Sequence, residues 1–239
     1  MRIIGRTDRG RVRGSNQDAW ACDAELGVAV LADGMGGLTG GEVASRAAVE
    51  CVLGHLAGVP CIDADSVREA IAAANGRVLE LSREQADGDM GTTLVVWARQ
   101  APGRYLLGHV GDSRAYRLSG AVLEPLTRDH SVVQAMVDDG RLSEADALCA
   151  PDRNLITRAV GLEVDVFADV VELEYEAEDA FLLCSDGLTD LLAPDELAEI
   201  CDGHLGPAMR DLPDSLVNAA NAAGGYDNIT VVLVYNCDP

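Results

Sequence analysis

Residues 27–37 read GVAVLADGMGG, and the interpretation of the whole chain starts from this stretch. Residues 27–32 are apolar without a break, which is typical of a short strand buried on both faces. The run ends at Asp33, so a carboxylate stands where the strand leaves the core. The glycines that follow allow close approach of other groups, because they carry no Cβ. The stretch predicts a buried strand that presents an acid at its end.

Three more aspartates border apolar strand-like runs. Asp112 follows LLGHVG, Asp186 follows FLLCS, and Asp227 stands just before ITVVLVY. Each aspartate taken singly is also compatible with a plain turn, because Asp-Gly and Asp-Asn are common turn formers. Converging buried carboxylates repel one another unless they are protonated or bind cations. Hard divalent cations prefer oxygen ligands, so the pattern favours a divalent metal site.

The remaining periodicity predicts an α+β fold. Strands are expected as a pair within 12–33 and at 92–98, 105–110, 114–118, 168–173, 180–184 and 229–235. Helices are expected at 42–56, 65–84, 195–201 and 215–223, with a short, polar helical stretch within 131–150. Because strands do not alternate one-for-one with helices, we expect antiparallel sheets covered by helices rather than a parallel sheet. The GTT at 91–93 is interpreted as a strand entry, and no linker divides the single domain of residues 1–239.

Composition excludes several classes of partner. The formal net charge of −22 argues against nucleic acid and anionic membranes, since both attract Lys and Arg. No window approaches the ~20 apolar residues of a membrane span, and five early arginines interrupt any signal peptide. The seven cysteines are odd in number and form no CxxC pair, which favours reduced thiols. We therefore expect a cytoplasmic protein, and a monomer.

Eight sequence blocks, taken in order, carry a resemblance to a known family. They are RGRVRGSNQDAW (9–20), VLADGMGGLTGGEVAS (30–45), GTTLVV (91–96), GHVGDSRAYRL (108–118), LTRDHS (126–131), RNLITRAVG (153–161), LLCSDGLTD (182–190) and YDNITVVLV (226–234). With these blocks the chain resembles the PP2C-like (PPM) family of metal-dependent protein phosphatases, in its bacterial form. The resemblance implies a central antiparallel β-sandwich flanked by helices on both sides, in α-β-β-α layers.

The resemblance also implies a metal centre with two core ions, Mn²⁺ or Mg²⁺. Asp33 resembles the carboxylate that bridges both ions, and the backbone carbonyl of Gly34 resembles a ligand of one of them. Asp186 and Asp227 resemble the remaining direct ligands. Asp18 resembles an acid that holds a metal through water.

Two further residues take roles from the same resemblance. Asp112 resembles the ligand that, together with Asp186, holds a third and weaker ion in bacterial members. Arg13 resembles the guanidinium that binds the substrate phosphate, and its planar fork suits phosphate oxygens. From the residues alone, a salt-bridged surface arginine is the favoured interpretation of Arg13, because five arginines lie within the first 13 residues.

The implied activity is hydrolysis of phosphoserine and phosphothreonine in proteins by a water activated between two metal ions. Its partners would be phosphorylated proteins, either targets of a cognate Ser/Thr kinase or the kinase itself. The alternative is a pseudophosphatase that binds partners without catalysis, although all the expected aspartates are present. Met35 stands where many eukaryotic relatives have a histidine proposed as general acid. His130 is then one alternative proton donor, weighed against a structural hydrogen-bonding role.

Residues 138–156 lie between two of the matching blocks, where family members carry a flap beside the active site. The stretch is polar and acidic, with only Leu142, Ala145 and Leu148 as a thin apolar face. We expect a mobile flap that contributes to substrate choice and not to the chemical step.

Overall fold

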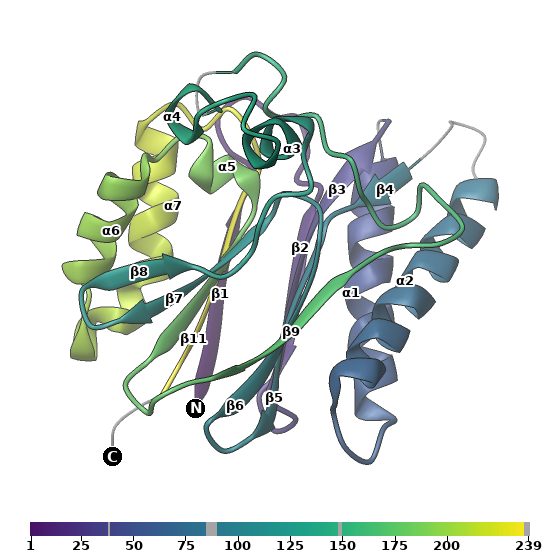
Figure 1. The fold of residues 1–239 in the computed structure, drawn as a ribbon, viewed down its shortest axis with the longest axis horizontal. Helices are drawn as coiled ribbons and strands as arrows, with labels where there is room; N and C mark the ends of the chain where they lie inside the picture. Colours follow the sequence, from purple (N-terminus) through teal and green to yellow (C-terminus); the bar gives the residue numbers. More distant parts are fainter. Residues whose placement is uncertain (38, 85–89, 148–149, 237–239) are drawn as a thin grey trace.

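The computed structural model describes residues 1–37, 39–84, 90–147 and 150–236. Two antiparallel sheets lie face to face, and helices cover both outer faces (Figure 1). The first sheet has the order β1 (Arg2–Asp8), β11 (Ile229–Tyr235), β10 (Ala180–Cys184), β7 (Arg114–Ser119) and β8 (Val122–Pro125). The second has the order β2 (Asp18–Asp23), β3 (Val28–Gly36), β5 (Leu94–Ala101), β6 (Arg104–Val110) and β9 (Asp169–Glu174), and β4 (Met90–Thr92) also pairs with β3.

The helices divide between the two sheets. The second sheet is covered by α1 (Gly40–Ala57) and α2 (Ala64–Glu84). The first is covered by α5 (Asp186–Thr189), α6 (Pro194–Asp202), the 3₁₀ helix η1 (Gly206–Asp211) and α7 (Leu212–Ala222). The short helices α3 (Val132–Asp138) and α4 (Glu144–Ala147) lie over one end of the sandwich, close to α5 (Figure 1). No helix in the described ranges combines the length and hydropathy needed to cross a bilayer.

Strand β3 shows why the opening stretch of the sequence is apolar throughout. Val28, Val30 and Ala32 pack toward the helices α1 and α2, whereas Ala29 and Leu31 pack into the core between the sheets. Both faces of the strand are therefore buried, as the sequence predicts.

The structure adds elements that the sequence pattern does not reveal. Strands β1, β4 and β8 were not expected, and β1 and β8 form the two edges of the first sheet. Edge strands are paired on one side only and are partly exposed, so their sequences lack a clear apolar period. The residues 91–93 do not simply enter a strand: Gly91 and Thr92 end β4, and Leu94 begins β5.

Cysteines in the described ranges are free thiols, at positions 22, 51, 61, 184 and 201. Cys149 and Cys237 lie outside the described residues, as does Leu148 of the expected flap.

The core between the sheets contains an aromatic cluster around Phe181. Its ring centroid lies 4.3 Å from that of Tyr105, 5.4 Å from that of Trp97 and 5.7 Å from that of Tyr175. We expect Phe181→Ala to lower the free energy of unfolding by about 3–5 kcal/mol, because it removes a large buried side chain and leaves a cavity. Urea denaturation measures this. The control Val122→Ala, at a side chain that is 66% exposed, should change stability by no more than about 0.5 kcal/mol.

Candidate metal centre

Asp18 and Asp33 are direct register partners on the neighbouring strands β2 and β3. Asp33 also stands where β3 changes its partner on the other side, since β5 pairs with it up to Leu31 and β4 pairs with it from Gly34. The two carboxylates therefore project from one end of the second sheet, at the point where its regular pairing is interrupted.

Thr92 and Thr93 fix the backbone of Asp33. The Asp33 N–H donates to Thr93 Oγ1 over 2.9 Å, and the Asp33 carbonyl accepts from Thr92 Oγ1 and from Thr93 N, each over 2.8 Å. Thr93 Oγ1 also shares a hydrogen bond of 2.7 Å with Ser113 Oγ, next to Asp112. Sequence reasoning missed this role, and the only signal was the GTT block itself.

Asp18 is connected to the first sheet through hydroxyl groups. Its Oδ2 accepts from Ser185 Oγ over 2.9 Å and from Thr230 Oγ1 over 2.6 Å. These hydroxyls belong to the segment before Asp186 and to strand β11, so the contacts join the two sheets at the same end. Neither Ser185 nor Thr230 was predicted as a site residue, because a serine or threonine beside a strand carries no distinctive pattern.

Asp186 begins helix α5, and that helix packs directly against the segment that carries Asp227. A Cβ at Gly187 would lie 2.0 Å from the carbonyl oxygen of Asn228, so only glycine permits this approach. The Asn228 side chain in turn accepts from Gln17 N over 2.8 Å and donates to the carbonyl of Ser15 over 2.9 Å. Asn228 thereby secures the N-terminal loop beside the acids.

That loop carries Arg13 to the open side of the acidic cluster. Its Nη2 lies 2.6 Å from Asp227 Oδ2, and the Arg13 side chain remains 53% exposed. The hydrogen bond from Arg13 to Asp227 raises the pKa of the guanidinium, and the nearby carboxylates of Asp186 and Asp33 act in the same direction. Arg13 thus contacts a predicted metal ligand while part of its fork faces solvent.

Gly34 lies beside Asp33 and packs against the start of α1. A Cβ at this position would lie 2.0 Å from the carbonyl oxygen of Gly41 and 2.6 Å from that of Gln17. Any side chain here would force α1 away from the site.

The ionised form is unfavourable for four of these aspartates, whose pKa values are raised. Burial, followed by repulsion from Asp18 and Asp186, holds the pKa of Asp33 well above its usual range. Burial and repulsion from Asp112 and Asp227 do the same for Asp186. Burial raises the pKa of Asp18 to about 6. Burial and the nearby Asp129 carboxylate raise the pKa of Asp112 to about 6.

The structure therefore brings together all the predicted site residues, and their chemistry fits divalent cations. Among the described residues, Asp18 Oδ1 and Asp186 Oδ1 are buried oxygens that have no hydrogen-bond partner. Buried oxygens without partners are unfavourable unless a cation or a proton compensates them. An all-oxygen donor set suits Mn²⁺ and Mg²⁺.

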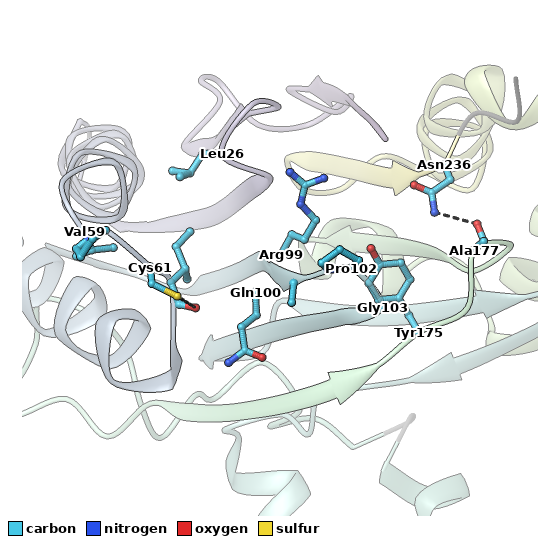
Figure 2. Close-up of a pocket in the computed structure, with 13 residues that line it drawn as sticks. Leu26, Val59, Cys61, Arg99, Gln100, Pro102, Gly103, Tyr175, Ala177 and Asn236 are labelled. Carbon is cyan, nitrogen blue, oxygen red and sulfur yellow. Dashed lines mark hydrogen bonds between the residues drawn. The ribbon is translucent and has the colours of Figure 1, made fainter.

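Two surface pockets differ in their relation to these acids. One, of about 690 Å³, opens beside Asp112 and Asp186 and is also lined by Val133 of α3 and by Glu144 and Ala147 of the expected flap region. The other, of about 780 Å³, lies at the β5–β6 turn, and its lining includes Cys61, Arg99 and Tyr175 (Figure 2). Asp112 follows the opposite end of β6, so of these two pockets the first adjoins the acidic cluster.

Comparison with known proteins identifies the family. The family profile described as protein phosphatase 2C matches residues 11–225. The chain belongs to the protein phosphatase 2C family. It is 36% identical over 238 residues to the serine/threonine phosphatase stp of Listeria monocytogenes, covering 96% of this chain and 93% of that protein.

Solved structures of the protein phosphatase 2C family agree with the fold. The Mycobacterium tuberculosis serine/threonine phosphatase PstP/Ppp superposes with a TM-score of 0.91 at 34% identity, covering 99% of each chain. The catalytic domain of PstP in complex with two manganese ions gives a TM-score of 0.88 at 33% identity, covering 99% of this chain and 98% of that one. The family and the layered fold predicted from the sequence are thus confirmed.

The raised pKa of Asp33 predicts an unusual effect of Asp33→Asn on stability in EDTA. A carboxyl whose pKa is raised in the folded state destabilises that state once it is ionised, so we expect the variant to unfold at a higher denaturant concentration than the wild type at pH 7.5. The advantage should shrink toward pH 5.5, because the wild-type carboxyl then holds its proton.

Paired urea denaturation curves of the two proteins at the two pH values test this. A variant that is less stable than the wild type at pH 7.5 in EDTA would show that the ionised Asp33 carboxylate does not destabilise the fold.

Proposed function

We propose that this chain hydrolyses phosphoserine and phosphothreonine in proteins, with Mn²⁺ or Mg²⁺ bound by the acidic cluster. One observation supports this above all: the predicted aspartates converge at one end of the sandwich, with two buried oxygens unpaired and a half-exposed arginine beside them. The enzyme class predicted from the sequence, a metal-dependent serine/threonine protein phosphatase, is confirmed by the family and by the names of its relatives.

For the core of the site, we propose the ligand set that the resemblance implies. Asp33 would bridge two ions, with the Gly34 carbonyl, Asp186 and Asp227 as further direct ligands. The ions would supply a polarised water and neutralise charge on the phosphoryl oxygens. The burial of Asp33 and Asp186 supports these roles, because their carboxylates are stabilised only by cations or protons.

Asp18 and Asp112 would act at the margins of the centre. The hydroxyls of Ser185 and Thr230 already occupy one oxygen of Asp18, which favours its proposed contact with a metal through water. Asp112 lies beside the 690 Å³ pocket together with Asp186, in keeping with a third, weaker ion between them.

Arg13 would bind the phosphate of the substrate. Its contact with Asp227 uses one nitrogen and leaves further N–H groups for phosphate oxygens. The carboxylate also holds the guanidinium in place, which reduces the entropy that is lost when the substrate binds.

The source of the proton for the leaving serine or threonine oxygen is not a histidine at position 35. Met35 has no ionisable proton, and His130 is 6% exposed with its ring engaged by Gly111 and Asp169. These contacts favour the structural hydrogen-bonding role of His130 over the donor role.

We further propose a cytoplasmic monomer whose substrates are targets of a cognate Ser/Thr kinase, or the kinase itself. The free cysteines of the described ranges support a reducing compartment. The pseudophosphatase alternative finds no support in the site, because every aspartate that it would be expected to lose is present.

The decisive experiment is metal-dependent turnover of p-nitrophenyl phosphate and of a phosphothreonine peptide. Activity should vanish in EDTA and return with Mn²⁺ or Mg²⁺. Asp186→Asn should lower kcat by at least about 10²-fold, because it removes a ligand charge and displaces the reacting groups. The exposed Asp195→Asn is the matched control and should keep full activity. Full activity in chelator would refute the proposed chemistry.

Arg13→Ala should raise KM for phosphopeptides by about 10-fold or more, since one charge-assisted phosphate contact is lost. Binding of Mn²⁺, measured by calorimetry, should not weaken, because the lost guanidinium repels cations. Arg13→Lys keeps the charge but loses the planar fork, so its KM should lie between those of the wild type and Arg13→Ala. Lost metal binding at normal KM would contradict the proposed role.

For the flap we expect a separation of substrates. The cleft beside Asp186 is partly lined by Glu144 and Ala147, which supports a role in binding the phosphoprotein. Replacing residues 142–147 with Gly and Ser should leave p-nitrophenyl phosphate turnover within about tenfold, or ~1.4 kcal/mol. Activity on phosphoprotein should fall much further. Equal loss of both activities in a folded variant would exclude this role.

A further inference from the structure

His130 lies in the segment between β8 and α3, and its hydrogen bonds join three separate parts of the chain. Its backbone N–H donates to the Gly111 carbonyl over 2.8 Å, and its own carbonyl accepts from Thr157 N over 2.7 Å. Its ring Nε2 lies 3.1 Å from Asp169 Oδ2, at the start of β9. The proposed function gives His130 a structural hydrogen-bonding role without naming what that role positions.

Both backbone hydrogen bonds of Gly111 are made with this one residue. Besides the carbonyl contact, the Gly111 N–H donates to His130 Nδ1 over 3.1 Å. Gly111 has a φ of 107°, in the left-handed region that favours glycine, and Asp112 follows it immediately. The direction in which the chain enters Asp112 is therefore set by His130.

Asp169 fixes the orientation of the His130 ring. Because Nδ1 accepts a backbone N–H, the neutral ring carries its proton on Nε2 and donates it to the Asp169 carboxylate. Burial lowers the pKa of His130 and favours this neutral form. Arg158 Nη1 lies 3.2 Å from Asp169 Oδ1, which keeps that carboxylate ionised and in place.

The same side chains also form a candidate metal site, which the hydrogen bonding argues against. The ligand atoms of His109, His130 and Asp169 lie within 4.8 Å of one another. A metal on His130 Nε2 would force the proton onto Nδ1, where it would face the Gly111 N–H. The metal ion would also be repelled by the Arg158 guanidinium, whose Nη1 lies 3.2 Å from His130 Nε2. The cluster is better explained as a device that orients the ring.

The other end of the Asp112 turn is held by contacts that do not involve the His130 ring. Arg114 donates to both carboxylate oxygens of Asp129 over 2.9 and 2.7 Å, and Ser113 contacts Thr93. A change at His130 should therefore release the Gly111 peptide without unfolding the turn.

We propose that His130 is a positioning residue for Asp112: its ring, oriented by Asp169, fixes the Gly111 peptide and so aims the Asp112 carboxylate toward Asp186. The His130 carbonyl also accepts from Thr157 N, so the same residue fixes the backbone where the chain leaves the expected flap. This inference rests on the proposed function, in which Asp112 contributes to a third and weaker metal site.

Two substitutions separate the ring contacts. In His130→Asn the amide oxygen takes the place of Nδ1 and still accepts from Gly111, whereas in His130→Gln the amide reaches toward Asp169 and leaves Gly111 without its acceptor. We expect His130→Gln to weaken the weaker phase of Mn²⁺ binding, measured by calorimetry, by about 10-fold or more. Turnover of p-nitrophenyl phosphate at fixed Mn²⁺ should fall in kcat with little change in KM. His130→Asn should keep both properties within about threefold.

Nitrogen-15 NMR of the wild type in EDTA gives a readout that needs neither metal nor turnover. The His130 ring should show its proton on Nε2, and the Gly111 amide proton should shift upfield in His130→Gln but not in His130→Asn. Thermal melts identify variants that merely lose stability.

The inference is overturned if the ring carries its proton on Nδ1, if the wild type shows no weaker Mn²⁺ phase, or if both variants lose Mn²⁺ affinity equally. A wild type that binds Mn²⁺ in two phases but hydrolyses no phosphoester would refute the proposed function alone, because calorimetry and NMR would still report the positioning.

Discussion

The burial of the carboxylates of Asp18, Asp33 and Asp186, together with repulsion from neighbouring acids, is the constraint on which the rest of this structure depends. Burial and proximity raise the pKa of each carboxyl, so the site favours protons or cations over bare charge. The fold holds these groups together only because many neutral contacts surround them, including the hydroxyls of Ser185 and Thr230 and the backbone bonds to Thr93. The packing of the sandwich therefore offsets the free-energy cost of these buried carboxylates, a cost that bound metal ions would reduce.

Both sheets contribute acids to the candidate site. The second sheet supplies the pair Asp18 and Asp33 through the register of β2 and β3, while the first sheet supplies Asp186 and Asp227 from the segments beside β10 and β11. Neither sheet forms the site alone, and the hydroxyl bridge from Asp18 to Thr230 crosses between them. The PstP catalytic domain, whose fold this chain shares, has been solved in complex with two manganese ions.

The sequence located the elements whose apolar periodicity is strong and missed those whose periodicity is weak. Helices α1 and α2 and the interior strands have long apolar patterns, and the sequence located them to within a few residues. The edge strands β1 and β8 escaped because their partly exposed residues carry no clear period. Among site residues, Asp33, Asp112 and Asp186 were found because each follows an apolar run, and Asp227 because it precedes one. Asp18 was found only through the family resemblance, and Thr93, Ser185 and Asn228 have common turn-like contexts. The assignment of individual roles to the aspartates came from family resemblance and not from their spacing.

The sequence by itself determined the layered α+β class, the acidic character of the chain and the identity of the aspartates, because strand periodicity and residue type are local properties. Only the tertiary structure decided which groups meet. Arg13 and Asp227 are 214 positions apart yet lie 2.6 Å from each other, and His130 reaches both Gly111 and Asp169. Such contacts depend on how two sheets pack and on how loops cross their ends. No local pattern encodes those distances, because they result from the packing energy of the whole core.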